Sequence, residues 1–146
     1  MVSLPLYIHK LFDNPFANND FVRMSRKKPD ILFIDDELHW CRVMEELADF
    51  MGFNVFTTTS PRHGLRKFLR GHFDLVITDI RMPDESGFSF IRRIRKHDSE
   101  IPIIIVTGFN TNKVHRLAET LNVQKVLIKP FRVSDLEEAI SELLGM

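Results

Sequence analysis

From Pro29 to the C-terminus, five short apolar runs alternate with longer segments whose apolar residues recur at helical spacing. Continuous apolar runs of this length are typical of strands buried on both faces, and an amphipathic helical pattern follows each of them. This alternation predicts an α/β fold, with a doubly wound parallel sheet, right-handed crossovers and helices on both faces. The expected strands are residues 31–34, 54–58, 73–78, 102–106 and 124–128.

Local signals mark the ends of several predicted helices. Gly52 is expected to end the first helix, and Ser60, which precedes Pro61, is expected to cap the second. Ser134 and Glu137 have the spacing of a capping box, which predicts Ser134 as the N-cap of the last helix. Five strands and five helices are therefore expected along the chain.

The first 28 residues differ from the rest, because they show no sustained period and carry five basic against two acidic side chains. We interpret residues 1–28 as a flexible N-terminal extension, in which Met24 is a candidate natural start. Residues 29–146 are long enough for one domain. Because the last predicted helix runs close to Met146, we expect either a stand-alone domain or one cut from a longer chain.

Charge and cysteine content limit the expected partners. The chain carries 20 basic and 20 acidic side chains, so no overall field draws it to nucleic acid or to an anionic membrane. No stretch approaches the roughly 18 apolar residues of a membrane span. Cys41 is the single cysteine and lies in a helical pattern, so we interpret it as a core residue in a reducing cytoplasm. We predict a cytoplasmic protein with no direct nucleic-acid or membrane partner.

Polar side chains follow the predicted strands at their carboxyl ends. They are Asp35 and Asp36 after the first strand, Asp79 after the third, Thr107 after the fourth and Lys129 after the fifth. Because ligands bind beyond this edge of a doubly wound sheet, we expect these side chains to gather there. Three carboxylates raise one another's pKa unless a cation shares them, and such oxygen ligands suit Mg²⁺. With that charge neutralised, the Asp79 carboxylate could attack a phosphoryl group in line.

Four motifs in order carry a resemblance to a known family. They are Phe-Ile-Asp-Asp-Glu at residues 33–37, Thr-Asp-Ile-Arg-Met-Pro at 78–83 with Gly87, Val-Thr-Gly at 106–108 and Ile-Lys-Pro-Phe at 128–131. On these motifs, residues 29–146 resemble the CheY-like receiver domain of two-component response regulators. The resemblance implies a flavodoxin-like sheet of five strands in the order 2-1-3-4-5.

The resemblance also implies roles for individual residues. Asp79 would be the phosphoacceptor and Asp36 a direct Mg²⁺ ligand, while Asp35 would act largely through water. The backbone carbonyl of Arg81 would be a further ligand to the metal. Such a domain accepts a phosphoryl group in a self-catalysed transfer and is not classed as an enzyme.

Other implications concern the phosphoryl group and the partners. Lys129 would contact the phosphoryl group, Thr107 would turn inward to bond it, and the Lys129–Pro130 peptide is often cis in this family. The donor would be a histidine kinase or a histidine phosphotransfer protein. The recipient of the signal would be a downstream protein or a detached output domain. Formation of a homodimer is a further possibility.

Three positions depart from the family pattern or flank the site. Val126 stands where the family has an aromatic switch residue, so the usual readout is missing or transferred to another group. Arg81 and Phe109 flank the expected entry of the attacking water, which predicts an altered phosphoryl lifetime. Trp40, next to the acidic residues, is interpreted as a surface aromatic.

Alternative functions stay open at this stage. Asp35 and Asp36 could simply cap a helix, since acids are frequent there. A phosphatase with an aspartate nucleophile needs a second acid two residues after it, where this chain has Arg81, which cannot act as an acid. A flavin phosphate would be repelled by the acids after the first strand. A pseudo-receiver that binds partners without phosphorylation is the remaining alternative.

Overall fold

The computed structural model describes residues 27–146, which form five strands and five helices. The strands are β1 (Asp30–Ile34), β2 (Asn54–Thr58), β3 (Leu75–Thr78), β4 (Ile103–Thr107) and β5 (Lys125–Ile128). The helices are α3 (Leu38–Met51), α4 (Pro61–Arg70), α5 (Gly87–His97), α6 (Asn112–Thr120) and α7 (Val133–Leu144). The predicted extension at residues 1–28 and the candidate start at Met24 lie outside the described residues, except for residues 27 and 28.

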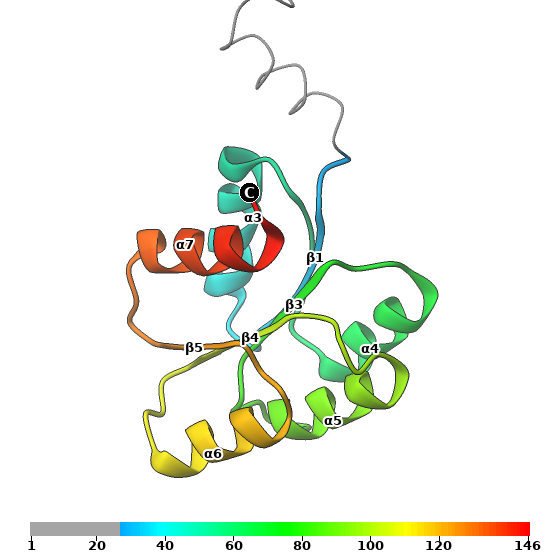
Figure 1. The fold of residues 1–146 in the computed structure, drawn as a ribbon, viewed down its shortest axis with the longest axis vertical. Coiled ribbons are helices and arrows are strands. Elements are labelled where there is room, and N and C mark those ends of the chain that lie inside the picture. The colour runs from blue at the N-terminus through cyan, green and yellow to red at the C-terminus, as the bar shows by residue number, and fades with distance from the viewer. Residues whose placement is uncertain (1–26) are drawn as a thin grey trace, which may run out of the picture.

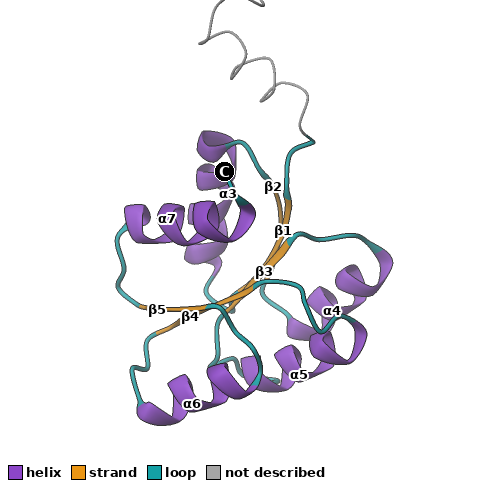
Figure 2. Cartoon of the chain, in the orientation of Figure 1, coloured by secondary structure: helices purple, strands orange, loops and turns teal. Residues whose placement is uncertain are grey.

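All strand pairs are parallel, and the sheet has the order β2-β1-β3-β4-β5 (Figure 2). The order implied by the family resemblance is therefore confirmed, and so is the doubly wound α/β architecture. The third strand begins at Leu75, two residues later than expected, and the Asp74 carboxylate accepts a hydrogen bond from the Asp30 N–H at 2.8 Å.

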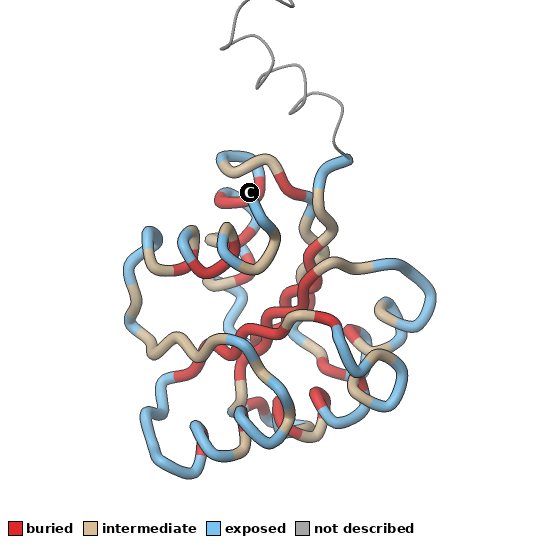
Figure 3. Tube along the Cα trace, viewed as in Figure 1, coloured by how far each residue is buried: buried red, intermediate tan, exposed pale blue. Residues whose placement is uncertain are grey.

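Helices cover both faces of the sheet, with α3 and α7 on one face and α4, α5 and α6 on the other (Figure 1). Alternate residues of each strand point to opposite faces, so β1 contributes Ile31 and Phe33 to the core under α3 and α7. Leu32 and Ile34 belong to the core under the other three helices. Burial is densest along the central strands (Figure 3), which explains why their sequences are continuously apolar.

The ends of the helices follow the sequence signals with one exception. Gly52 has φ 80°, the left-handed conformation that favours glycine after a helix, and the Ser60 hydroxyl accepts the His63 N–H at 3.2 Å. The prediction of Ser134 as the N-cap of the last helix is wrong. The N-cap is Arg132 and the helix begins at Val133, two residues earlier than predicted, because the Asp135 carboxylate accepts the Arg132 N–H at 3.1 Å.

Candidate functional site

Backbone hydrogen bonds beyond the strand ends bring the predicted site residues to one edge of the sheet. The Asp79 N–H donates to the Ile34 carbonyl at 2.9 Å, and the Lys129 N–H donates to the Thr107 carbonyl at 2.8 Å. The Asp35 N–H donates to the carbonyl at the end of β2, at 3.2 Å. These bonds continue the parallel ladders by one residue, so the positions of the side chains are set by the register of the sheet.

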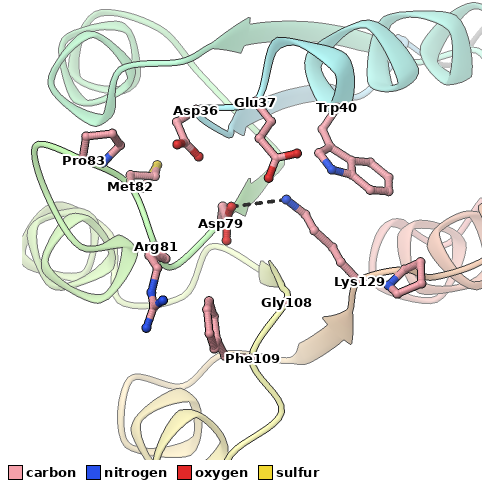
Figure 4. A pocket seen from close by; sticks show the side chains of 11 residues that line it. Asp36, Glu37, Trp40, Asp79, Arg81, Met82, Pro83, Gly108, Phe109 and Lys129 are labelled. Carbon is pink, nitrogen blue, oxygen red and sulfur yellow. Dashed lines mark hydrogen bonds and ion pairs between the residues drawn. The ribbon is translucent and has the colours of Figure 1, made fainter.

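Asp35, Asp36 and Asp79 each offer a carboxylate oxygen, and these oxygens lie within 4.8 Å of one another. Asp36, Asp79 and Lys129 line a surface pocket, which is called the pocket below. The Asp35 and Asp79 side chains are buried, whereas Asp36 is exposed. Lys129 extends into this group from the end of β5 (Figure 4). Its Nζ lies 2.6 Å from Asp35 Oδ2 and 3.2 Å from Asp79 Oδ2, so one ammonium group bridges two buried acids.

The electrostatics of the cluster favour an added cation. The pKa of Asp35 is raised to about 6, chiefly by burial and also by the nearby Asp79 charge, while hydrogen bonds from Lys129 and the Glu37 N–H oppose the rise. Burial lowers the pKa of Lys129, but its ion pairs with the two acids outweigh that effect and raise it overall. Three carboxylates against one ammonium leave excess negative charge. Hard oxygen donors in this arrangement, one of them exposed, fit Mg²⁺ with some of its waters retained.

The Asp79 carboxylate is held at both oxygens. Oδ1 accepts the Ile80 N–H at 2.6 Å, and Oδ2 accepts Lys129 Nζ. The backbone behind it is packed against the start of α5, where the Gly87 N–H donates to the Ile80 carbonyl at 2.8 Å. A Cβ atom at Gly87 would lie only 2.0 Å from the Asp79 carbonyl oxygen, so this position requires glycine.

Thr107 reaches the same edge but does not contact the acids. It is fully buried at the end of β4, and its hydroxyl accepts the Phe109 N–H at 3.2 Å. Within residues 27–146, no hydrogen bond joins this hydroxyl to Asp79. On the neighbouring strand, Val126 is paired with Ile105 and packs into the core under α4, α5 and α6, so the switch position holds a small, partly buried side chain.

Trp40, interpreted from the sequence as a surface aromatic, lines the pocket and makes contacts that the sequence did not predict. Trp40 is partly buried, and its ring packs on Phe131 with a centroid separation of 4.9 Å. Lys129 Nζ lies 5.0 Å from the Trp40 centroid, so the indole lies beside the bridging lysine. Phe131 reaches Trp40 from the loop between β5 and α7, and no motif in the sequence indicated this contact.

Arg81 and Phe109 meet on the opposite side of the pocket (Figure 4). The guanidinium carbon of Arg81 lies 3.8 Å from the centroid of the Phe109 ring, which is the geometry of a stacked cation–π pair. Both side chains are exposed, and Phe109 retains 38% of its accessible surface. The sequence predicted that both residues flank the site, and the structure adds that they contact each other.

Cys41 lies below the cluster and takes no part in it. The buried thiol is 3.5 Å from the Asp35 carbonyl oxygen. Burial, reinforced by the charges of Asp35 and Glu45, raises the pKa of the Cys41 thiol to about 11. A protonated, buried thiol is not a nucleophile, so the prediction that Cys41 is a core residue is confirmed.

The chain matches known proteins over the folded part. The family model described as the response regulator receiver domain matches residues 31–141. The chain is 31% identical over 122 residues to a transcriptional regulatory protein, ZraR, of Salmonella typhimurium, covering 84% of this chain and 28% of that protein. It is 34% identical over 117 residues to a probable transcriptional regulator, ycf27, of Galdieria sulphuraria, covering 79% and 45% respectively.

Solved structures agree with this match. A CheY-like receiver domain protein from Methanospirillum hungatei superimposes with a TM-score of 0.78 at 25% identity, over 82% of this chain and 95% of that one. A receiver domain protein from Clostridium thermocellum gives a TM-score of 0.74 at 34% identity, over 80% and 94%. The curated relatives are longer, since this chain spans half of their length or less. Among residues 27–146, no helix has both the length and the apolar character needed to cross a membrane.

Proposed function

The chain belongs to the response regulator receiver domain family, and we propose that Asp79 is the aspartate on which it accepts a phosphoryl group. Phosphorylation on an aspartate is general to this family. One observation carries the assignment to Asp79: its carboxylate is buried among two further acids and is bridged to Asp35 by Lys129. We assign residues 29–146 to the receiver domain.

We propose that the acidic cluster holds Mg²⁺, as receiver domains typically do at this position. Asp36, Asp79 and the backbone carbonyl of Arg81 would be direct ligands, and Asp35 would act largely through water. The bound metal would neutralise charge on the phosphoryl oxygens and on the cluster. The exposed position of Asp36 supports this proposal, because water and metal can reach its carboxylate.

Asp79, Lys129 and Thr107 have different roles in the proposed phosphoryl transfer. An Asp79 oxygen attacks phosphorus in line, a new O–P bond forms, and the bond from phosphorus to the donor nitrogen or oxygen breaks, leaving the electron pair on the donor. Lys129, already 3.2 Å from Asp79, would shift its contact to a phosphoryl oxygen. Thr107 would exchange the Phe109 N–H for a bond to the phosphoryl group. The chain is therefore an acceptor in this scheme and not an enzyme that turns over.

Receiver domains act between kinases and output domains, and we propose the same for this chain. The donor would be a histidine kinase or a histidine phosphotransfer protein in the cytoplasm. The recipient would be a downstream protein or an output domain on another chain. Because two relatives are named as transcriptional regulators, an output that acts on transcription is a candidate.

The test is phosphorylation by acetyl phosphate, with and without Mg²⁺, followed by intact mass measurement. We expect a metal-dependent gain of about 80 Da, the mass of one phosphoryl group of the kind these sites transfer, and no gain in Asp79→Asn. Asp84→Asn is the matched control, because Asp84 is an exposed aspartate in the same loop and should leave the gain unchanged.

Two results would contradict the proposal. An equal gain in Asp79→Asn would mean that another residue accepts the phosphoryl group. No gain in the wild-type chain, when it is folded and binds Mg²⁺, would favour a pseudo-receiver that binds partners without phosphorylation.

A further inference from the structure

The helices on the two faces of the sheet carry opposite charge. Helices α4, α5 and α6 together contain ten basic and one acidic side chain, a net charge of +9. Helices α3 and α7 contain one basic and seven acidic side chains, a net charge of −6. These two groups lie on opposite sides of the sheet (Figure 1). The neutrality of the whole chain therefore conceals a strong separation of charge.

Several of the basic side chains are free to meet a partner. The basic face is defined here as Arg62, Arg66, Arg70, Arg92, Lys96 and Arg116, all of them exposed. None of these six forms an ion pair with a carboxylate within residues 27–146. Arg93 is excluded because it pairs with Glu85 at 3.3 Å, and Arg95 because it donates to the Leu121 and Ile101 carbonyls.

The spacing of the basic face produces rows of charge. Arg62, Arg66 and Arg70 recur every four residues, so they lie along one side of α4 with neighbouring Cβ atoms about 5–6 Å apart. Arg92 and Lys96 have the same spacing on α5, which packs beside α4. Five of the six residues are arginines, whose planar guanidinium group can bind a phosphate through two parallel hydrogen bonds.

The apolar content of these helices indicates which anionic partner fits. Among the described residues, Leu69 is the only large, strongly exposed apolar side chain on α4, α5 or α6. Stable protein interfaces need an apolar centre, and peripheral membrane binding is strengthened by apolar side chains that enter the lipid. Binding to a nucleic-acid backbone needs neither, because the phosphates and the release of counterions supply the free energy.

We propose that the basic face binds the phosphate backbone of duplex nucleic acid, without reading the bases. The expectation of no direct nucleic-acid partner rested on the lack of a helix-turn-helix segment and on the net charge of the whole chain. The charge separation removes the second ground, and contact with the phosphate backbone alone does not require the first. The acidic face formed by α3 and α7 would be repelled by the same duplex, so only one side of the molecule would bind. The pocket around Asp79 lies at the edge of the sheet and not on this face, so the proposal does not depend on phosphorylation.

The test measures the fluorescence anisotropy of a labelled duplex titrated with the full chain, between about 50 and 200 mM salt. We expect log K to fall linearly with log salt, by about 0.9 for each phosphate contacted, and a dissociation constant of roughly 10⁻⁴–10⁻⁶ M at physiological salt. Arg66→Glu and Arg92→Glu should each weaken binding roughly fivefold, and their combination should reduce the salt slope by about 2.

Arg42→Glu is the matched control. Arg42 is exposed on the acidic face, so this change alters the total charge by the same amount while leaving the basic face intact. We expect less than a twofold effect on binding, and circular dichroism should show that all variants are folded.

Three results would overturn the proposal. The first is no salt-dependent binding at about 50 mM salt, and the second is an equal loss of binding in Arg42→Glu and Arg66→Glu. The third is a different occupant of the same face. Binding to phosphatidylserine vesicles without binding to the duplex would identify a membrane, whereas self-association in low salt that Arg66→Glu abolishes would identify the acidic face of a second copy.

Discussion

The pocket around Asp79 has two walls, and they are held in different ways. In the buried wall, Asp35, Asp79 and Lys129 are joined by ion pairs of 2.6 and 3.2 Å, and no side chain of the three exposes more than 11% of its surface. In the exposed wall, Arg81 and Phe109 lie in solvent and are stacked on each other at 3.8 Å. Strand register and burial fix the buried wall. The exposed wall depends on a single contact between two solvent-exposed side chains.

This difference separates two kinds of function within one site. The buried wall contains the groups that we propose to accept and neutralise a phosphoryl group. The exposed wall is suited to control access by water or by a partner. Changes to the buried wall should therefore affect folding and transfer by large factors, and changes to the exposed wall should adjust rates by small ones.

The largest effect is expected from Gly87→Ala, which acts on the backbone behind Asp79. The added Cβ would meet the Asp79 carbonyl oxygen at 2.0 Å, so the start of α5 must move. We expect a loss of about 3 kcal/mol in the free energy of unfolding, measured by urea denaturation, and a failure to accept a phosphoryl group. Gly108→Ala is the control on the exposed wall, where an added Cβ meets no atom within 4 Å, and it should change stability by less than about 0.5 kcal/mol. Equal losses in the two variants would remove the distinction between the walls.

Lys129→Met should have the next largest effect. It removes the ammonium group that bridges the buried acids, and with it the positive charge that we propose would contact the transferred phosphoryl group. We expect the rate of phosphorylation by acetyl phosphate to fall by about 100-fold, as measured by mass spectrometry at fixed times. A fall of less than about threefold, in a variant that still binds Mg²⁺, would show that Lys129 is not part of the transfer chemistry.

Asp35→Asn tests how much the ionised Asp35 carboxylate in the buried wall destabilises the folded chain. Because the pKa of Asp35 is raised from 3.8 to about 6 in the folded state, its ionised form opposes folding above pH 6. Protonation relieves this cost as the pH falls from about 6 towards 4. Without Mg²⁺, we therefore expect Asp35→Asn to stabilise the chain by about 2 kcal/mol at pH 7.5 and by less at pH 5.

The exposed acid of the same cluster provides the comparison for that measurement. Asp36→Asn should stabilise the chain less at pH 7.5, because water already solvates the Asp36 carboxylate. If Asp35→Asn stabilised the chain more at pH 5 than at pH 7.5, the result would be opposite to this expectation and would contradict the raised pKa of Asp35.

The smallest effect is expected from the exposed wall. If the stacked pair restricts the entry of water, Arg81→Asn and Phe109→Glu should each shorten the lifetime of the phosphorylated chain by roughly twofold to fivefold, since an exposed cation–π contact contributes about 0.5–1 kcal/mol. The double variant should decay little faster than either single variant, because each single change already breaks the contact. Unchanged decay rates would refute a role for the pair.

The sequence predicted the buried wall more completely than the exposed one, for a physical reason. An apolar run precedes each of Asp35, Asp79 and Lys129. Parallel strands bring their carboxyl ends to one edge of the sheet, independently of the conformation of the loops. Arg81 and Phe109 lie in loops, and their spacing in the sequence carries no information on whether two exposed side chains stack.

The other differences between prediction and structure arise from competition between nearby residues and from contacts made by loops. Ser134 had the right spacing for a cap, but Asp135 satisfied the backbone of Arg132 and the helix began earlier. The contact between Trp40 and Phe131 was not predicted, because Phe131 comes from a loop distant in the sequence.

The position of Trp40 gives the protein a built-in optical probe. It is the single tryptophan of the chain, and its ring lies 5.0 Å from the ammonium group that bridges the two buried acids. A nearby positive charge alters the emission of an indole, so any event that draws Lys129 away from the ring should change the intensity or the colour of the emitted light. Metal binding, acceptance of a phosphoryl group and their reversal can then be followed in real time, on the unlabelled protein and with the pocket unaltered.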